Sequence, residues 1–219
     1  MAASVERLRK AHVANASKIT KSGRIAKRIL DLAGSIFLLL LLLPVIAVIA
    51  LLIKIEDGGP VIFRRRVIGK KGEFDALKLR SMYVDADKIL ERDGALLKEF
   101  EVSFKLKNDP RVTRIGAWTR KLSLDELPQL LNVLRGEMSL VGPRMITRPE
   151  LDKYGDAGWI FNSMKPGLTG YWQVSGRQEV SYEQRVRMDL HYVTSWSIWL
   201  DLAILMKTPM RVFRGAGAY

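Results

Sequence analysis

The sequence contains no cysteine, and it has only two histidines, His12 and His191, in 219 residues. The lack of cysteine excludes a disulfide scaffold, a thiolate zinc site and cysteine-based catalysis. The wide separation of the two histidines along the chain argues against a histidine metal site. A bound metal would therefore be held by carboxylate and phosphate oxygens, which favours Mg2+ or Mn2+ over zinc.

Negative charge is also scarce, because 23 acidic residues face 36 lysines and arginines and leave a formal net charge of +13. The apolar share of 48% is ordinary for a folded protein, so the composition excludes global disorder. A basic excess of this size needs an anionic partner, such as nucleic acid, acidic lipid or a phosphorylated substrate. We do not expect a nucleic-acid binder, because the chain has a long apolar run and no recognised nucleic-acid motif.

Residues 32–53 form a run of 22 residues without a charged side chain, which is long enough to cross a membrane. Pro44 lies in the middle of this run and would leave helical arms of roughly 18 and 14 Å at ~1.5 Å per residue. Each arm covers about half of the ~30 Å hydrocarbon core. Basic residues flank the run on both sides and prefer the cytoplasm, so we predict a re-entrant helix hairpin bent at Pro44. One straight transmembrane helix is the alternative.

The rest of the chain predicts an α+β fold that is mainly helical. Apolar stretches and glycine turns in residues 58–79 indicate a small β-hairpin. After the hairpin, the spacing of the apolar residues along the chain is typical of helices. Near the C-terminus, Trp196 and Trp199 beside cationic residues favour an interfacial helix, with an ordinary core helix as the alternative. We divide the chain into a basic N-terminal segment (1–23), a membrane helix (24–57), a cytoplasmic catalytic domain (58–192) and a C-terminal interfacial helix with its tail (193–219).

Two adjacent acidic residues, Asp125 and Glu126, are the strongest candidates for chemistry. Ser123 and Glu126 have the spacing of a capping box, so a purely structural explanation exists. Pro128 would then lie inside the helix, whereas a helix that starts at Pro128 accommodates it better. In that arrangement the acidic pair lies on irregular backbone beside a helix N-terminus and near Arg120, which suits Mg2+ and phosphate chemistry.

Other cations could face a phosphate. Lys78 and Arg80 lie on the same face of a predicted strand, because side chains alternate between the two faces. Two cations on one face suit a diphosphate, although a solvated edge strand explains them equally well. Arg144 follows a Gly-Pro turn that can present a guanidinium to phosphate, and a plain surface turn is the alternative. Residues 165–177 are rich in glycine but lack the spacing of known phosphate-binding loops, so a structural loop is the simplest interpretation.

These segments together resemble the bacterial sugar transferases, namely the monotopic polyprenyl-phosphate phosphoglycosyl transferases of the short, single-domain kind. The resemblance covers residues 24–219, and its motifs stand in the family's order. They are Lys27-Arg28 with Asp31, Pro44, Gly59-Pro60, and the segments 78–82, 108–111, 123–130, 138–144, 166–170 and 173–177. The ending, residues 214–219, is similar to that of short members that serve exopolysaccharide synthesis.

The resemblance implies a two-step transfer at the cytoplasmic face of the bacterial inner membrane, as the first membrane step of exopolysaccharide or glycoconjugate synthesis. Asp125 would attack the sugar-bearing phosphorus of a UDP-sugar, release UMP and keep a covalent sugar-phosphoryl group. Undecaprenyl phosphate would then take up that group and leave as the lipid-linked sugar diphosphate. The ending favours galactose or glucose as the sugar, with an N-acetylated diamino sugar as the alternative.

The same resemblance assigns roles to individual residues. Asp125 and Glu126 would be the catalytic pair and the ligands of Mg2+, which neutralises charge on the substrate diphosphate. Contacts to the substrate are expected from Lys78, Arg80, Arg120, Arg144, Gln173 and Arg177. Because the lipid phosphate lies at the membrane interface, the active site is expected there as well, among short interfacial helices and anionic membrane lipid.

Three positions depart from the family pattern. Arg65 stands where a Gln is usual, Val67 where an Arg is frequent, and Met145 where many members carry the second proline of Pro-Arg-Pro. Two other functions stay open. The lipid phosphate would attack directly, with the acidic pair serving only Mg2+, or the chain would be a non-catalytic membrane scaffold that binds acidic lipid. The sequence leaves the oligomeric state open.

Overall fold

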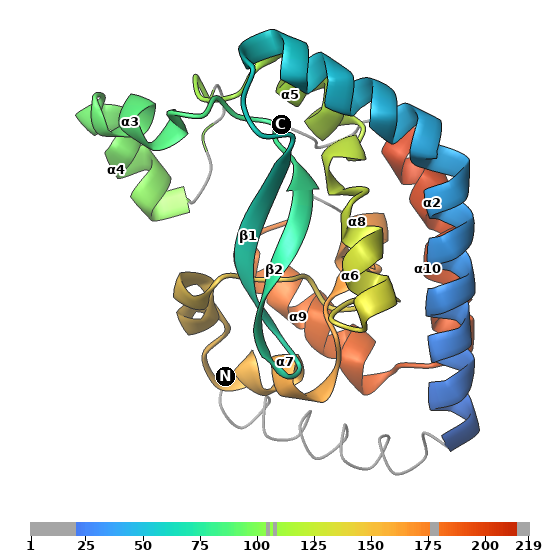
Figure 1. The fold of residues 1–219 in the computed structure, drawn as a ribbon. Helices are drawn as coiled ribbons and strands as arrows, with labels where there is room; N and C mark the ends of the chain where they lie inside the picture. The colour runs from blue at the N-terminus through green and yellow to red at the C-terminus, as the bar shows by residue number, and fades with distance from the viewer. Residues whose placement is uncertain (1–20, 104–105, 107–108, 176–179, 214–219) are drawn as a thin grey trace.

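The computed structural model describes residues 21–103, 106, 109–175 and 180–213, so the predicted basic segment lies outside it except for residues 21–23. The described chain is mainly helical and has two small sheets, which confirms the predicted α+β class (Figure 1). The boundaries of the four predicted segments stay predictions.

A β-hairpin lies at the centre of the view in Figure 1. Its strands β1 (Ile62–Gly69) and β2 (Gly72–Leu79) are antiparallel, with Ile62 opposite Leu79 and Gly69 opposite Gly72. The predicted hairpin is therefore confirmed. Gly72 has a φ of 110° in the turn, a backbone angle that favours glycine.

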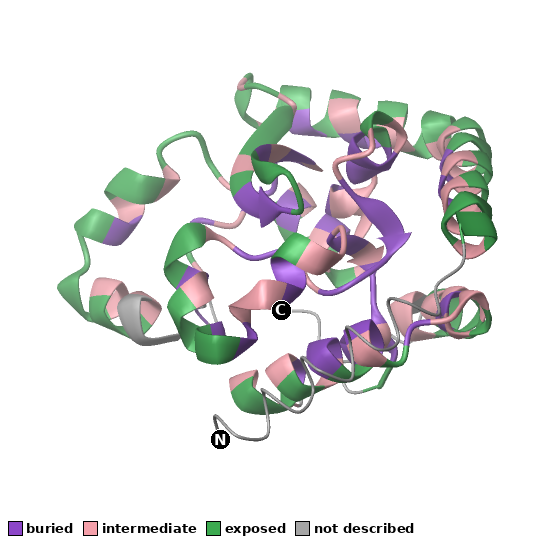
Figure 2. Ribbon diagram, turned by 90° about the horizontal axis from the view of Figure 1, so that it is seen from below, coloured by how far each residue is buried: buried purple, intermediate pink, exposed green. Residues whose placement is uncertain are grey.

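Helices and a second, parallel sheet of two strands surround the hairpin. In chain order they are α3 (Ala86–Glu91), α4 (Gly94–Ser103), α5 (Arg114–Lys121), η1 (Leu124–Glu126), α6 (Gln129–Arg135), β3 (Ser139–Val141), η2 (Arg148–Trp159), α7 (Ile160–Ser163), β4 (Gly167–Thr169), α8 (Tyr171–Ser175), α9 (Tyr182–Thr194) and α10 (Ile198–Phe213). Buried side chains from the hairpin, α6, β3, α7 and α9 form the main hydrophobic core. Figure 2 shows these buried segments at the centre of the molecule, with exposed faces around them.

One long helix, α2 (Lys21–Asp57), runs along the outside of the molecule. It continues through Pro44, and Figure 1 shows it as one bent helix with two arms, the effect that a proline inside a helix has. Within the described ranges, α2 is the one helix that is long and apolar enough to cross a membrane.

Most of α2 faces away from the protein. Its buried residues are Asp31, Ser35, Ile49 and Ile53. Its exposed large apolar side chains are Ile25, Ile29, Ile36, Phe37, Leu40, Leu41, Leu43, Val45, Val48, Leu51, Leu52 and Ile55. An apolar surface of this extent marks a contact with a membrane or another apolar partner.

Polar contacts fasten the first arm of α2 to the protein body. The Lys27 ammonium donates to the fully buried Asp201 carboxylate at 2.6 Å. Arg28 donates from Nη1 and Nη2 to two carbonyl oxygens near the end of α6, at 2.8 and 2.9 Å. Asp31 accepts a hydrogen bond from the Ser139 hydroxyl at 2.8 Å. These bonds fix the first arm beside α6, β3 and α10.

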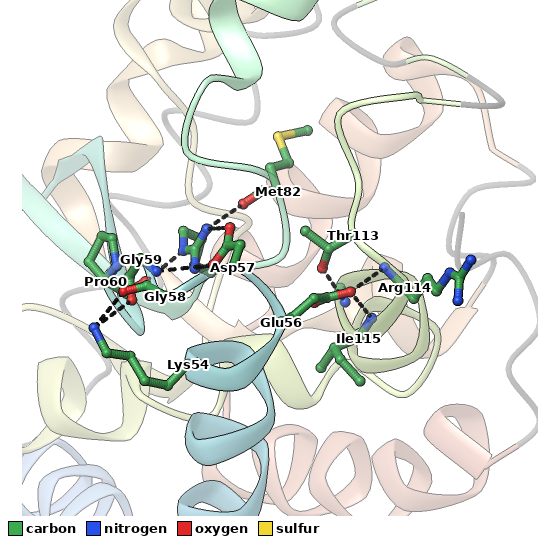
Figure 3. A network of polar contacts seen from close by, with 12 residues as sticks. Lys54, Glu56, Asp57, Gly58, Gly59, Pro60, Met82, Thr113, Arg114 and Ile115 are labelled. Atoms are coloured by element: carbon green, nitrogen blue, oxygen red, sulfur yellow. Dashed lines mark hydrogen bonds and ion pairs between the residues drawn. The ribbon is translucent and has the colours of Figure 1, made fainter.

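The other end of α2 is fastened as well (Figure 3). The Asp57 carboxylate forms a two-pronged ion pair with the Arg80 guanidinium, just beyond β2. One residue earlier, the Glu56 carboxylate accepts hydrogen bonds from the backbone nitrogens of Arg114 and Ile115 at 2.9 and 3.3 Å. Both ends of the apolar helix therefore bind the same protein body.

The C-terminal helix α10 packs against α2 and also contributes to the core. Asp201 and Ile204 are buried on one side of it, whereas Trp199 and Met206 are 76% and 82% exposed. The helix thus combines a core face with an exposed apolar face, and its position at a membrane interface stays a prediction.

Replacing Lys27 with methionine should destabilise the protein strongly. Asp201 also accepts hydrogen bonds from Tyr192 Oη at 2.7 Å and Trp196 Nε1 at 3.1 Å, so it stays buried when its ion-pair partner is lost. We expect the free energy of unfolding, measured by denaturant titration in micelles, to fall by about 3–5 kcal/mol. The exposed control Lys21→Met should change it by no more than about 0.5 kcal/mol. Similar values for both variants would contradict the anchoring role.

Candidate active site

The predicted acidic pair lies in the short turn η1, which connects α5 to α6. Ser123, just before it, has a left-handed φ of 55°, and its side chain makes no capping hydrogen bond. The capping box with Glu126 is therefore not formed. Pro128 has helical backbone angles and directly precedes Gln129, the first residue of α6. Asp125 and Glu126 thus lie in a short 3-10 helix rather than on irregular backbone, ahead of a helix that begins within one residue of the predicted start.

Lys78, near the end of β2, is the counter-ion of both acids. Its Nζ atom lies 2.6 Å from Glu126 Oε1 and 3.8 Å from Asp125 Oδ2. The side chains of the three residues are 9–22% exposed, so water screens this interaction only in part. The hairpin therefore delivers one cation to the predicted catalytic pair.

The two carboxyl groups differ in their pKa. Burial raises the pKa of Asp125 to about 6, although the charges of Lys78 and Arg120 oppose the rise. Burial also acts on Glu126, but the charge and hydrogen bond of Lys78, together with the charges of Arg144 and Arg65, more than offset it, so the pKa of Glu126 is lowered. Both groups are ionised at neutral pH, and the poorly solvated Asp125 is the better placed of the two to act as a nucleophile.

Two arginines extend the positive field around the pair. Arg120 on α5 donates from Nε to Ser81 Oγ at 2.8 Å, and its charge acts on Asp125. The positive charge of Arg144, which follows β3, acts on Glu126. Burial lowers the pKa of both guanidinium groups. Cations drawn this far out of water indicate that the site is built for an anion.

The loop that carries Arg144 interlocks with β4 at the backbone level. A Cβ atom on Gly142 would come within 2.5 Å of the Lys165 carbonyl oxygen, and one on Gly167 within 2.1 Å of the Gly142 nitrogen. Only glycine fits at this crossing. Arg144 forms a β-bridge with Gly167, and its Cζ atom lies 4.9 Å from the centre of the Trp172 ring. The two glycine-containing motifs therefore place Arg144 beside Trp172.

Several buried polar atoms around this site have no hydrogen-bond partner within the described part of the chain. They include both side-chain polar atoms of Gln129, Nε of Arg144, Nε1 of Trp172, Oε1 of Gln173, and Nε and Nη2 of Arg185. Each unpaired group of this kind costs about 1–3 kcal/mol, and folded proteins contain few of them. Their accumulation next to the acidic pair indicates a binding site for a polar ligand.

Arg80, which we expected beside Lys78, points elsewhere. Strand β2 ends at Leu79, so the alternation of side chains along a strand does not extend to Arg80. Arg80 is 7% exposed, pairs with Asp57, and donates from Nε to the Pro60 carbonyl oxygen at 2.6 Å. It anchors the end of α2, and the structure brings Lys78 alone from this segment to the acids.

The two remaining predicted contacts lie near α8. Gln173 donates from Nε2 to the Leu168 carbonyl oxygen at 3.2 Å, which leaves its Oε1 atom unpaired among the described residues. Arg177 lies outside the described residues.

Sequence reasoning missed Arg185 on α9 and Glu150 on η2, and it noted Arg65 only as a departure from the family pattern. All three lie close together, because the Glu150 carboxylate pairs with both arginines. Local sequence gives no signal for Arg185, since Arg187 follows two positions later on the same helix and is 73% exposed.

Mg2+ fits this site as a partner of a phosphorylated substrate. Among the described residues, no group of three or more histidine, aspartate and glutamate side chains is arranged to hold a metal ion. Asp125 and Glu126 supply two carboxylates, and Mg2+ is commonly bound by one or two carboxylates together with substrate phosphates. Lys78, at 2.6 Å from Glu126, would share that carboxylate with the ion.

Comparison with known proteins agrees with this geometry. A family model described as bacterial sugar transferase matches residues 22–215. The UDP-galactose-lipid carrier transferase of Erwinia amylovora is 50% identical over 204 residues, which cover 90% of this chain and 42% of that protein. The undecaprenyl-phosphate galactose phosphotransferase of Salmonella typhimurium is 46% identical, with 91% and 43% covered. The exopolysaccharide production protein ExoY of Rhizobium meliloti is 46% identical, with 90% and 89% covered. The chain thus spans less than half of the first two relatives and most of the third.

Arg80→Lys should reduce stability and leave substrate affinity unchanged. A lysine cannot reproduce the two-pronged pair with Asp57 together with the hydrogen bond to Pro60. We expect the free energy of unfolding to fall by about 1.5–3 kcal/mol in denaturant titration. Arg114→Lys is the matched control, because that side chain is exposed. A raised KM for the phosphorylated substrate at unchanged stability would instead place Arg80 in the binding site.

Proposed function

This chain belongs to the bacterial sugar transferase family, and we propose that it transfers a sugar 1-phosphate from a UDP-sugar to undecaprenyl phosphate with release of UMP. The observation that carries the proposal is the buried Asp125 carboxylate, which lies beside Lys78 and near the partly desolvated Arg120, with the desolvated Arg144 acting on the neighbouring Glu126. The names of the relatives supply the substrates: UDP-galactose with a lipid carrier, and undecaprenyl phosphate with galactose or glucose. Galactose or glucose is accordingly the proposed sugar, and exopolysaccharide synthesis the proposed pathway.

The reaction runs in two displacements at one phosphorus atom. In the first, a carboxylate oxygen of Asp125 forms a bond to the sugar-bearing phosphorus, and the bond to UMP breaks with its electron pair on the UMP oxygen. In the second, an oxygen of undecaprenyl phosphate attacks the same phosphorus and releases the Asp125 carboxylate. No net proton transfer is required, so the site needs positive charge more than it needs a general base.

The chain's own residues supply that charge. Lys78 touches both acids, and it would neutralise charge on the transferred phosphoryl group while Glu126 holds the lysine in place. Arg120 and Arg144 extend the field on either side. Mg2+, held by Asp125 and Glu126 together with substrate phosphate oxygens, would add further neutralisation when bound.

We propose that α2 enters the membrane and returns to the same face. Both of its ends bind one protein body, through Lys27–Asp201 and Arg80–Asp57. A helix that crossed the bilayer would carry those ends to opposite sides, so one body could not hold both. The exposed apolar faces of α2 and α10 then contact lipid, and the body lies on the cytoplasmic face of the bacterial inner membrane.

Cysteine labelling tests this topology, because the chain has no cysteine of its own. We would introduce single cysteines at the exposed positions Lys21 and Asp87, on either side of the apolar run. Neither should react with an impermeant maleimide in intact cells, and both should react in inverted membrane vesicles. Labelling of one position in intact cells would show that α2 spans the membrane.

Asp125→Asn tests the chemistry. Incubated with UDP-sugar and no lipid acceptor, the wild-type enzyme should release about one UMP per active site and stop, because the covalent intermediate accumulates. The peptide that contains Asp125 should carry the sugar and phosphate, as measured by mass spectrometry. Asp125→Asn should lose both the burst and the turnover, since an amide cannot attack the phosphorus.

The control Asp152→Asn makes the same change at an exposed position and should keep the burst. Turnover by Asp125→Asn above a few per cent of the wild-type rate, or a wild type without an adduct, favours direct attack by the lipid phosphate. No UMP release from any UDP-sugar would favour the non-catalytic scaffold.

A further inference from the structure

A second cluster of charged side chains lies next to the acidic pair and is centred on Glu150. The Glu150 side chain is mostly buried, and its Oε2 atom accepts hydrogen bonds from the backbone nitrogen and the hydroxyl of Thr147 at 2.9 and 3.0 Å. Arg65 Nη2 lies 3.5 Å from the same oxygen, and Arg185 Nη2 lies 3.9 Å from Oε1. At these distances the carboxylate attracts both arginines but leaves their hydrogen-bonding capacity largely unused.

Arg185 is the most enclosed of these cations. It is 7% exposed, and its guanidinium lies 3.9 Å from the centre of the Tyr182 ring and 5.7 Å from that of Trp172. Arg144 approaches the same Trp172 ring at 4.9 Å. Nε and Nη2 of Arg185 and Nε of Arg144 are buried without an acceptor in the described part of the chain. Buried donors of this kind indicate a ligand rich in acceptor oxygens.

We call Arg65, Arg144 and Arg185 the arginine trio. Two carboxylates, Glu150 and the buried Asp189, lie near the trio. Asp189 accepts hydrogen bonds from Tyr154 Oη at 2.8 Å and, more weakly, from the Arg144 backbone nitrogen. With all four carboxylates of the site ionised, the trio, Lys78 and Arg120 supply five positive charges against the four negative charges of Asp125, Glu126, Glu150 and Asp189. A phosphate monoester carries about two negative charges near pH 7, so it would satisfy the charge and the unpaired donors together.

The arginine trio adjoins Glu126, the acid that also pairs with Lys78 at 2.6 Å. The charge of Lys78 acts on both acids, that of Arg120 acts on Asp125, and those of Arg144 and Arg65 act on Glu126. In a displacement at phosphorus, the attacking and leaving oxygens are roughly in line. With Asp125 as the attacking group, the leaving group lies on the far side of the phosphorus from Asp125, and the buried unpaired donors of Arg144 and Arg185 are available to bind it.

We propose that the arginine trio binds the phosphate of the departing UMP, which makes Arg185 and Arg65 substrate-binding residues alongside Arg144. This inference rests on the proposed function. As the phosphorus–oxygen bond breaks, its electron pair stays on the UMP phosphate, and the trio stabilises the added charge without a proton. Lys78 and Arg120 serve the transferred sugar-phosphoryl group. The two cation groups thus divide the diphosphate between them.

UMP itself is the probe for this site. We would measure its equilibrium binding to the full-length protein in nanodiscs by calorimetry, and that of uridine, which lacks the phosphate. Arg185→Gln should weaken UMP binding at least tenfold and leave uridine binding within about twofold, because the lost contact is to phosphate. Arg187→Gln, on the exposed side of the same helix, should leave both affinities unchanged. Unchanged UMP binding by Arg185→Gln, or an equal loss for UMP and uridine, would overturn the proposal.

Two further variants keep the test decisive. Arg65→Gln changes a side chain that is 38% exposed on β1, so it should fold even if Arg185→Gln does not. It should weaken UMP binding at least threefold, and unchanged binding would count against the trio. Asp125→Asn should lose turnover and still bind UMP, because the trio does not include Asp125. Failure of that turnover prediction would reject the covalent mechanism, whereas the UMP affinities would still report on the trio.

Discussion

The ion pair between Asp57 and Arg80 links the apolar helix to the chemistry of the site. Asp57 ends α2, and Arg80 lies two residues after Lys78, the cation that touches both acids. Lys78 is therefore only two residues away from the point at which the end of the apolar helix is fastened. The ion pair between Lys27 and Asp201 fixes the first arm of α2 to the protein body. Removing one partner of a buried pair leaves an uncompensated charge, so each contact is far more costly to break than its own strength suggests.

The site itself is an unfavourable arrangement that a ligand would relieve. Asp125 is ionised at neutral pH against the effect of burial, and the guanidinium groups of Arg120 and Arg144 are drawn out of water. Gln129 is fully buried with both polar atoms unpaired in the described structure. Groups held in this state by a rigid fold need no reorganisation when a charged substrate arrives, which is the basis of electrostatic preorganisation. Stability is given up for this purpose.

The parts that could be predicted from the sequence are those governed by local rules. Pro128 fits a helix that starts beside it, and this rule correctly predicted that Asp125 lies ahead of α6. The glycine turns indicated the β-hairpin. The predicted position of Arg80 beside Lys78 was wrong, because side chains alternate only within a strand and β2 ends at Leu79. The sequence did not show where the strand ends. Arg185 could not be found, because its burial depends on contacts with η2 and α8, which are distant in sequence.

The two-sided nature of α2 bears on how this protein reaches its folded state. Ile49 and Ile53 on its inner side form a small cluster with Leu79 of the hairpin, while neighbouring residues such as Val48 and Leu52 face outward. The same helix is thus a wall of the protein interior and the surface that meets lipid. It is not a detachable anchor on an independently folded enzyme. In the proposed topology, insertion into the bilayer and completion of the interior would be coupled during biosynthesis, so that a chain denied a membrane would also be denied its fold.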